Sequence, residues 1–364
     1  MAAPQGKGFY IWKIPSCENG NAESIATNAA NAQLTHVLVK IADGTSYYNY
    51  DSTKKVDYVP AVVSALRNRG IETWGWHFCY GSDPVREAQI GGARAKALGL
   101  AGYVIDAEMQ WESSSKAASA RSFMTEVRKY LPSMPIALST FRYPTYHSLF
   151  PFAAFLEKCD LSMPQVYWEE AHNADTQLTR TVQEYRALSV IRPIFPTGPT
   201  YKVGTWAPTA KDINLFIKTA KNLNLDGVNF FSWDECKRDL ISLWNLIRDT
   251  DWPIVTASFQ EQYINGLNSK DPETLASLYS SLAVQITSSQ IVQGTEAIKT
   301  WYSTLFNQIL PNATFTLVGA TGTGNTRHIT WNATSSRGTV TNGSDTFGLL
   351  NDKIVYHYSN FKVV

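Results

Sequence analysis

Apolar residues in the first 250 positions fall into short runs separated by segments with helical spacing. The short runs predict eight β-strands, at Gly8–Ile14, His36–Ala42, Ile71–Tyr80, Gly102–Glu108, Pro135–Phe141, Leu161–Trp168, Arg192–Thr197 and Gly227–Trp233. Between them, apolar residues recur every three or four positions, as in amphipathic helices, at Tyr58–Asn68, Pro84–Leu98, Ser115–Tyr130, Thr176–Leu188 and Thr209–Leu223. This alternation predicts an α/β fold, a (β/α)₈ barrel of the TIM type. A doubly wound open sheet is the structural alternative, although no nucleotide-binding GxGxxG or Walker motif supports it.

The pattern changes after Asp251-Trp252-Pro253, which predicts a boundary between domains 1–252 and 253–364. Helical spacing comes first in the second part, at Val255–Leu267, Pro272–Ser280 and Gly294–Gln308. Strand-like segments follow, at Ala313–Gly319, Arg327–Thr334, Thr339–Asn342, Thr346–Leu350 and Ile354–Phe361, with a hairpin turn expected at Asn351-Asp352. Helices followed by strands predict a small, separate α+β domain.

Charge and hydropathy exclude several classes of partner. The formal net charge is +1 and no long charge run occurs, which argues against nucleic acid or an anionic membrane as the main partner. No stretch of 18 apolar residues is present, so no membrane span is expected. The first residues carry no signal-peptide core. Localisation stays open: extracellular or associated with the cell wall if a native signal peptide was trimmed, otherwise cytoplasmic.

The cysteines and histidines predict neither a metal site nor a cofactor. The four cysteines, at positions 17, 79, 159 and 236, show no CxxC or zinc spacing. Cys17 follows the first expected strand and Cys236 the eighth, and these strands are neighbours in a closed barrel. A disulfide between them is one hypothesis, and four unpaired buried thiols are the alternative.

Two carboxylates end the fourth expected strand. Because side chains alternate along a strand, Asp106 and Glu108 point the same way. Two adjacent acids can raise one pKa and leave the other group ionised, which is the division of labour that glycoside hydrolysis requires. In a barrel, chemistry lies at the carboxyl ends of the strands, where this pair stands. A salt-bridged strand end is the structural alternative.

Further polar and aromatic residues follow neighbouring strands and are expected to contact a substrate. These are Lys40, Asp43, Trp76, His77, Tyr80, Trp111, Gln165, Tyr167, Trp168, Asn229 and Trp233. On the third strand, Trp74, Trp76 and Phe78 share one face and His77 lies on the other. Three aromatic residues at this spacing are typical of packing, so His77 is expected to be the stronger site candidate. Trp111 is expected either to form a sugar platform or to cover the barrel rim.

Three of these strand ends resemble glycoside hydrolase family 25, the lysozyme-like muramidases. Lys40-Ile41-Ala42-Asp43-Gly44-Thr45 is similar to that family's Lys-x-x-Glu-Gly-Thr, and Gly75-Trp76-His77-Phe78 to its Gly-x-Tyr-His-Phe. Val104-Ile105-Asp106-Ala107-Glu108 matches its Asp-x-Glu strand, which the chitinase-like family 18 also has in related form. The resemblance implies that Glu108 is the general acid/base and that Asp106 assists the substrate's N-acetyl group. It places His77 and Tyr167 at the sugar subsite, and implies retention of configuration.

The sequence also departs from these families. The muramidase first strand carries an Asp near Tyr10, and its last strand carries an Asp where Asn229 stands here. The chitinase pattern has an Asp two residues before Asp106, where this chain has Val104. The expected activity is hydrolysis of a polymer of N-acetylated amino sugars, peptidoglycan-like first and chitin-like second. The alternatives are a barrel that binds carbohydrate without cleaving it, and a hydrolase of a different glycan.

The second domain resembles the nuclear transport factor 2-like group, which includes SnoaL-like and ketosteroid-isomerase-like proteins. The resemblance rests on 259–267, 294–298, 342–347 and 352–355. Enzymes of that group place an Asp in the segment that here reads Leu278-Tyr279-Ser280-Ser281-Leu282, which contains no acid. We therefore expect this domain to serve docking, ligand capture or homodimer formation rather than catalysis.

Overall fold

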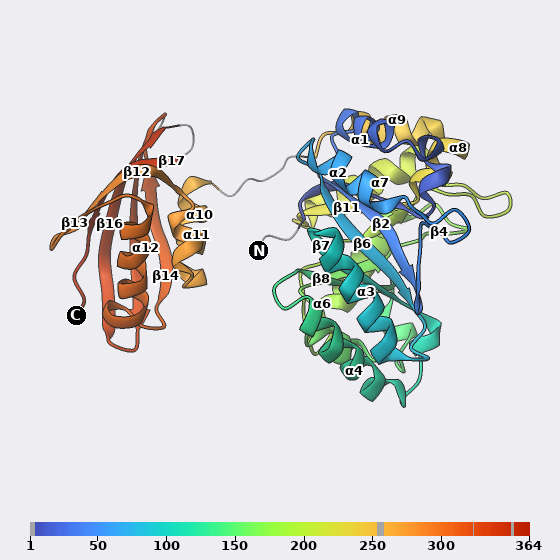
Figure 1. Cartoon of the computed structure of the whole chain (residues 1–364), viewed down its shortest axis with the longest axis horizontal. Coiled ribbons are helices and arrows are strands. Elements are labelled where there is room, and N and C mark those ends of the chain that lie inside the picture. Colours follow the sequence, from blue (N-terminus) through green and yellow to red (C-terminus); the bar gives the residue numbers. More distant parts are fainter. Residues whose placement is uncertain (1–3, 253–257, 323, 351–352) are drawn as a thin grey trace. The chain divides into compact units, whose positions relative to one another are not determined.

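The computed structural model describes residues 4–252, 258–322, 324–350 and 353–364, and the chain divides into two compact units, Met1–Ile254 and Val255–Val364. The expected boundary at 252/253 lies close to this division. Each unit has its own hydrophobic core. Figure 1 shows helices surrounding a barrel in the first unit and helices on one face of a sheet in the second.

The first unit is a closed barrel of eight parallel strands. Its sheet runs β1-β11-β10-β9-β8-β7-β6-β2, and β1 pairs with both β11 and β2, so the sheet has no break. The barrel strands are β1 Gly6–Ile11, β2 His36–Asp43, β6 Glu72–Cys79, β7 Gly102–Ala107, β8 Ile136–Phe141, β9 Leu161–Gln165, β10 Thr197–Pro199 and β11 Gly227–Phe231. The barrel is therefore the expected one, and the open-sheet alternative is excluded.

Nine α-helices cover the described part of the barrel, and they bury their apolar faces against the outside of the strands. They are α1 Ala22–Asn31, α2 Val59–Arg67, α3 Pro84–Leu98, α4 Lys116–Tyr130, α5 Phe152–Leu156, α6 Ala174–Arg186, α7 Ala210–Asn222, α8 Trp233–Asp239 and α9 Ile241–Asp249. Short 3₁₀ turns follow β1, β7 and β8: η1 Ile14–Ser16, η2 Glu18–Gly20, η3 Met109–Trp111 and η4 Pro144–Tyr146.

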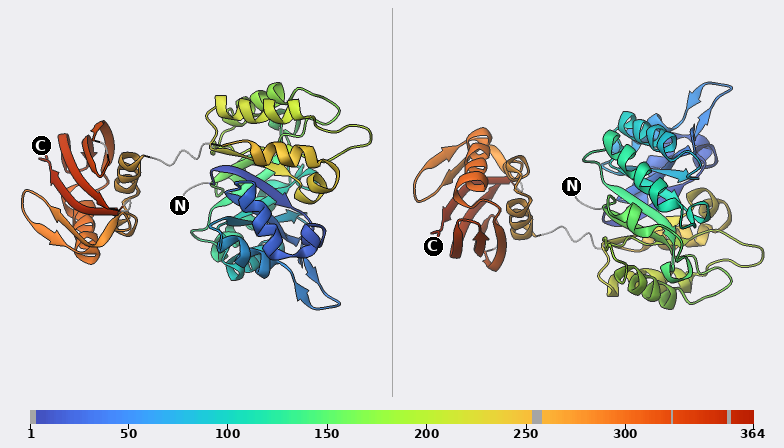
Figure 2. Two further views of the ribbon diagram at one scale, coloured as in Figure 1. Left: turned by 90° about the horizontal axis from the view of Figure 1, so that it is seen from above. Right: turned by 90° about the horizontal axis from the view of Figure 1, so that it is seen from below.

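An additional hairpin extends the rim of the barrel. β3 Ser46–Tyr47 pairs antiparallel with the end of β2, and β4 Tyr50–Asp51 pairs with β5 Val56–Asp57. Figure 2 shows this hairpin projecting from the body of the barrel.

Proline explains why the seventh strand is much shorter than expected. Only Thr197–Pro199 forms β10, and Ile194 makes a single isolated bridge to Ser162. Pro193, Pro196 and Pro199 have no N–H to donate to a neighbouring strand, so the ladder cannot continue.

A buried lysine fixes the first strand to the last helix. The Nζ of Lys7 donates to the backbone carbonyls of Ile247 at 2.8 Å and Thr250 at 2.5 Å, at the C-terminal end of α9. Burial lowers the pKa of Lys7 to about 8. This contact secures the segment at which the barrel closes.

The cysteines do not form the hypothesised disulfide. All four are free and buried. The Cys17 Sγ donates to the carbonyl of Lys13, and the Cys236 Sγ donates to the carbonyl of Leu240, so each thiol turns to its own local backbone. The alternative of unpaired buried thiols is the one that the structure contains.

The second unit is a curved six-stranded sheet with helices against one face. The strand order is β13-β12-β17-β16-β15-β14. Its elements are α10 Phe259–Ser269, α11 Pro272–Ala276, β12 Tyr279–Ile286, β13 Ile291–Gln293, α12 Thr295–Thr304, the π-helical turn η5 Leu305–Ile309, β14 Thr314–Thr321, β15 Thr326–Ser335, β16 Gly338–Leu350 and β17 Lys353–Asn360.

Two expectations for this unit were wrong. The helix expected over Pro272–Ser280 ends at Ala276, and two unexpected strands, β12 and β13, follow it. Thr339–Asn342 and Thr346–Leu350 belong to one strand, β16. Gly343, in the supposed break, lies so close to the Trp331 ring that a Cβ would approach it to 2.5 Å. This glycine permits close packing rather than a turn. The expected turn at Asn351-Asp352 lies outside the described residues.

Gly91 allows α3 to lie very close to the barrel strands. A Cβ at Gly91 would lie 2.2 Å from the Tyr103 hydroxyl and 2.4 Å from the His77 Nδ1. We expect Gly91→Ala to destabilise the protein by about 1–3 kcal/mol, although alanine favours helices. Gly92→Ala, whose Cβ would meet only the Tyr130 side chain at 3.0 Å or more, should cost less. Chemical denaturation of both variants measures the difference, and equal stabilities would contradict the expected clash.

Candidate active site

A glutamine side chain joins the two carboxylates at the end of β7. Asp106 faces the barrel interior, and Glu108 follows on the same side of the strand. The Nε2 of Gln165, at the end of β9, donates to the Asp106 Oδ1 at 2.9 Å and to the Glu108 Oε1 at 3.0 Å. Its contact with the Ser139 Oγ is longer, at 3.3 Å. The two carboxylate oxygens therefore lie within roughly 6 Å of each other.

The surroundings of Asp106 favour its protonated form. Burial and then the charge of Glu108 raise the pKa of Asp106 well above its usual range, and the Lys40 charge and the Gln165 amide oppose this rise. Of the two carboxyl groups, Asp106 is therefore the one whose protonated form burial favours.

A lysine enclosed by aromatic rings lies beside the pair. The Lys40 Nζ forms an ion pair of 2.6 Å with Asp43 and lies 4.8 Å from the centre of the Trp76 ring and 4.3 Å from that of Tyr48. The second oxygen of Asp43 accepts a hydrogen bond of 2.8 Å from the Tyr80 hydroxyl. The structure thus brings four of the expected site residues together at the ends of β2 and β6.

A group of aromatic side chains, called here the aromatic wall, surrounds Phe231 at the end of β11. Its ring centre lies 5.8–6.5 Å from the rings of Tyr10, Trp12, Trp76, Tyr167 and Tyr201. Most of these rings are partly exposed, unlike the fully buried rings deeper in the barrel. A partly exposed aromatic wall beside polar groups is the usual lining of a small-molecule site.

Three expected tryptophans lie outside the barrel interior. Trp111, Trp168 and Trp233 are fully buried in the core between strands and helices. The Trp111 Nε1 donates to the Cys79 carbonyl at 2.7 Å, and the Trp233 Nε1 donates to Glu18 at 2.8 Å. These buried rings offer no exposed face to a sugar, which argues against the expected substrate contacts, and for Trp111 it favours the packing alternative.

His77 also faces outward, because it alternates with Trp76 and Phe78 along β6. Its Nε2 contacts the Gly44 carbonyl at 2.8 Å and its Nδ1 contacts the Tyr103 hydroxyl at 2.6 Å. Burial lowers the pKa of His77 to about 4, so the ring is neutral at pH 7. The sequence favoured the face of β6 that carries His77. In the structure, the opposite face, with Trp76 and Phe78, points toward the candidate site.

Asn229 lies inside the barrel but deeper than the acids. Its Oδ1 is 2.7 Å from the Nε2 of His36, and its Nδ2 contacts the Met163 sulfur at 3.7 Å. Burial lowers the pKa of His36 to about 4. Asn229 and His36 fill the barrel interior, and Asn229 makes no described contact with Asp106 or Glu108.

This end of the barrel also contains residues that the sequence pattern did not indicate as site candidates: Trp12, Tyr48, Phe78, Ser139 and Phe231. A signal existed for Phe231, since it stands two residues after Asn229 on the same face of β11. No comparable signal marks Tyr48, which reaches Lys40 from the additional hairpin.

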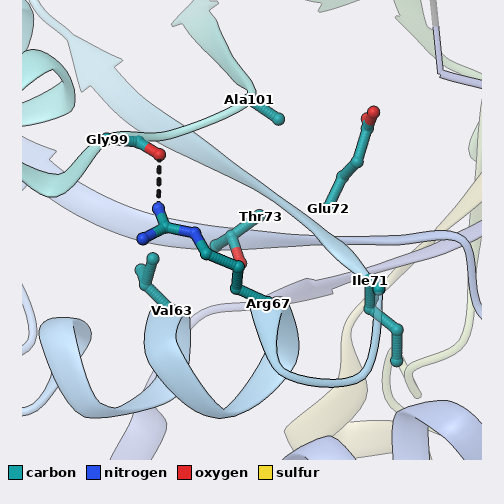
Figure 3. Close-up of a pocket in the computed structure, with 8 residues that line it drawn as sticks. Val63, Arg67, Ile71, Glu72, Thr73, Gly99 and Ala101 are labelled. Atoms are coloured by element: carbon teal, nitrogen blue, oxygen red, sulfur yellow. Dashed lines mark hydrogen bonds between the residues drawn. The ribbon is translucent and has the colours of Figure 1, made fainter. Parts of the chain in front are cut away.

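A pocket of about 220 Å³ lies at the opposite, amino-terminal end of the barrel strands (Figure 3). It is lined by the start of β6 and by the segment before β7, and Arg67 donates there to the Gly99 carbonyl at 2.7 Å. This end of such barrels serves stability rather than chemistry.

The second unit contains a buried polar network of its own. The Tyr279 hydroxyl bonds to the Tyr302 hydroxyl at 2.6 Å and to the His357 Nδ1 at 2.7 Å, and Tyr302 contacts Tyr263 at 3.0 Å. The His357 Nε2 lies 3.1 Å from Asp345, whose other oxygen accepts from Trp331. An acid therefore does enter this interior, from β16 rather than from the segment 278–282.

Within the described residues, no three His, Cys, Asp or Glu side chains gather as a metal site requires. Across the same residues, no helix is both long and apolar enough to cross a membrane.

Comparison with known proteins identifies only the second unit. Residues 260–357 match the family model of the SnoaL-like domain, so the C-terminal unit is a SnoaL-like, NTF2-like domain. No curated protein matches the chain. The resemblance of the barrel to glycoside hydrolase families 25 and 18 is supported by none of these matches.

Solved structures similar to the chain include two NTF2-like proteins of unknown function. The one from Cytophaga hutchinsonii is 12% identical, covering 31% of this chain and 95% of that one. The one from Mesorhizobium loti is 20% identical, covering 29% and 90%. A protein with a ketosteroid isomerase-like fold from Catenulispora acidiphila, solved with trimethylamine, is 13% identical, covering 29% and 85%. The TM-score is 0.26 for each.

The raised pKa of Asp106 predicts a pH-dependent stability. The native state binds more protons than the unfolded state between the unfolded pKa, about 3.9, and the higher native value. Stability therefore falls as the pH rises through that window. Asp106→Asn should remove this loss, which grows by about 1.4 kcal/mol for each pH unit between the unfolded pKa and the native pKa.

Thermal unfolding of wild type and Asp106→Asn from pH 4 to pH 8 measures this effect. The gap between the two should widen as the pH rises. Asp249→Asn is the control, because that carboxylate is exposed and its pKa is lowered by Arg248, so its effect should have the opposite sign. A constant gap for Asp106→Asn would contradict the assignment.

Proposed function

We propose that the barrel is a retaining glycoside hydrolase of polymers containing N-acetylated amino sugars, peptidoglycan-like first and chitin-like second. One observation carries the proposal: Asp106 and Glu108 share the amide of Gln165 at the carboxyl end of β7. A separation of roughly 6 Å or less is short for an inverting enzyme, which needs room for water between its carboxyl groups.

In this mechanism Glu108 donates the proton to the glycosidic oxygen. The mechanism requires a protonated Glu108 and an ionised Asp106 when substrate is bound, and the ionised Asp106 can then accept a hydrogen bond from the N–H of the substrate's acetamide. The acetamide oxygen, so oriented, attacks the sugar carbon as the glycosidic C–O bond breaks, and the alcohol leaves with the proton from Glu108. Water then attacks the same carbon and gives a proton to Glu108, and the bond from that carbon to the acetamide oxygen breaks. The charge of Lys40 supports the ionised form of Asp106 at that stage.

A carbohydrate-binding barrel without hydrolase activity is the second candidate. It is favoured by Tyr10 and Asn229, which stand where the resembling families carry carboxylates. Both side chains have partners inside the barrel: Tyr10 contacts the Met163 sulfur and Asn229 contacts His36. Hydrolysis of a different glycan is the third candidate.

Glu108→Gln tests the catalytic assignment. The change is nearly isosteric and removes the titrating group, so activity should fall by at least about 10²-fold while the folded structure is retained. Glu112→Gln is the matched control on the same segment, where Glu112 contacts His147 at 3.0 Å, and it should keep its activity.

Cell-wall turbidity, release from chromogenic N-acetylglucosaminides and direct glycan binding should be measured together on these proteins. Turnover by wild type that persists in Glu108→Gln would exclude Glu108 from the mechanism. Binding without turnover by wild type would favour the second candidate.

We further propose that the second unit forms a homodimer through the outer face of its sheet. Its helices cover the inner face, whereas Leu282, Tyr356 and Tyr358 are 78%, 42% and 41% exposed. Tyr356 lies beside Val284 and Tyr358 beside Ile286 in the pairing of β12 with β17, so these side chains form one apolar patch. Such patches commonly mark protein interfaces.

Light scattering after size exclusion tests the dimer. Wild type should have the mass of two chains, and Leu282→Asp combined with Tyr356→Glu should have the mass of one, because charges oppose burial of the patch. Tyr146→Glu, at an exposed tyrosine of the barrel, should leave the mass unchanged. A monomeric wild type at tens of micromolar would exclude the proposal.

A further inference from the structure

A pocket of about 590 Å³ lies beside the candidate active site, between the segment after β1 and the additional hairpin. It is lined by Lys13, Pro15, Ser16, Tyr47, Tyr48, Asn49, Tyr50, Asp51, Lys54 and Tyr58. Its volume is in the range of small-molecule sites, and tyrosines dominate its lining. The pocket stands at the end of β1 and β2 where the chemistry of such barrels occurs.

Tyr48 and Lys40 lie between this pocket and the Asp106–Glu108 pair. Tyr48 lines the pocket, and its ring lies 4.3 Å from the Lys40 Nζ. Lys40 lies in turn against Trp76 and Phe78, and Phe78 pairs with Asp106 between β6 and β7. A glycan held at the pair would reach the pocket by passing Lys40 and Tyr48 at this end of the barrel.

The hairpin is held rigidly against the barrel. The buried Asn49 accepts a hydrogen bond from the Ile14 N–H and donates to the carbonyls of Trp12 and Lys40. These bonds fix the hairpin to both neighbouring strands, so the pocket is formed before a ligand arrives.

The exposed rings of the pocket are also positioned in advance. The guanidinium of Arg94 lies 4.3 Å from the Tyr47 ring and makes two hydrogen bonds of 2.9 Å to Asp57. Tyr47 packs edge-on against Tyr50 at 6.5 Å, and the two are 47% and 40% exposed. Rigid, half-exposed tyrosines give a ligand contact area at little entropic cost, and burial in the core does not explain them.

The charge of the pocket selects among glycans. Two ammonium groups, Lys13 and Lys54, line it against one carboxylate, Asp51, which pairs with Lys54 at 3.5 Å. Lys13 lies over the Trp12 ring at 4.6 Å, beside the aromatic wall. An excess positive charge next to stacking surfaces suits a sugar unit that carries a carboxylate.

We infer that this pocket is an accessory subsite that binds a carboxylate-bearing amino-sugar unit next to the unit held at the catalytic pair. The inference rests on the proposed function for its placement along one glycan, and it selects the peptidoglycan-like class over the chitin-like class. Tyr47 and Tyr50 stack on the sugar ring, and Lys13 pairs with its carboxylate.

Calorimetric titration of the full chain tests the subsite, with Glu108→Gln as the background so that no ligand is consumed. The probes are a tetrasaccharide of alternating N-acetylglucosamine and N-acetylmuramic acid and the neutral chitotetraose. Tyr50→Ala should weaken binding of both probes by about tenfold. Lys13→Gln should weaken only the acidic probe, and Tyr146→Ala, at an exposed tyrosine outside the pocket, should change neither.

The outcomes separate this inference from the proposed hydrolysis. Affinities of Tyr50→Ala and Lys13→Gln within twofold of the background overturn the subsite, even if the wild type cleaves glycan. Losses in the predicted pattern support the subsite, even if the wild type shows no turnover. Each variant should first be shown to unfold at the temperature of the background protein.

Discussion

Closure of the first sheet is the constraint on which the rest of the barrel depends. β1 pairs with β11 on one side and with β2 on the other, and Lys7 fixes this strand to the end of α9. Because a closed sheet has only an inside and an outside, the two-residue alternation of each strand then decides the environment of every side chain. Asp106 is placed inside by the same alternation that places Ile105 outside.

The interior is divided into levels with different tasks. At the deeper level, Asn229 and His36 bond to each other among Phe195 and Met163, and both polar groups stay neutral. At the carboxyl end, Asp106 and Glu108 meet Gln165 and, nearby, the enclosed Lys40. Charge is thus concentrated where a ligand can enter and excluded where the strands pack most tightly.

The additional hairpin lies at the carboxyl end of the barrel, next to the candidate active site. The hairpin after β2 supplies Tyr48 to the lysine and, in our proposal, a subsite for the next sugar unit. The SnoaL-like unit adds a separate sheet whose outer face carries exposed apolar side chains. Hydrolysis, sugar selection and self-association would then belong to three different parts of one chain.

The order of the eight barrel strands, the acid pair and the α+β character of the second unit could all be predicted from the amino-acid sequence. These features depend on the alternation of apolar and polar residues, on helical spacing and on composition, all of which are local properties of the sequence. The sequence did not show which face of each strand lies inside the barrel. His77 was therefore preferred to Trp76 as a site candidate, although Trp76 is the one that faces the interior. For the same reason Trp111, Trp168 and Trp233 were expected at the site. Closure of the sheet and packing of the helices decided those positions. Only the tertiary structure brought Gln165 to Asp106 and Glu108, because β9 and β7 lie far apart in sequence but are separated by one strand in the barrel.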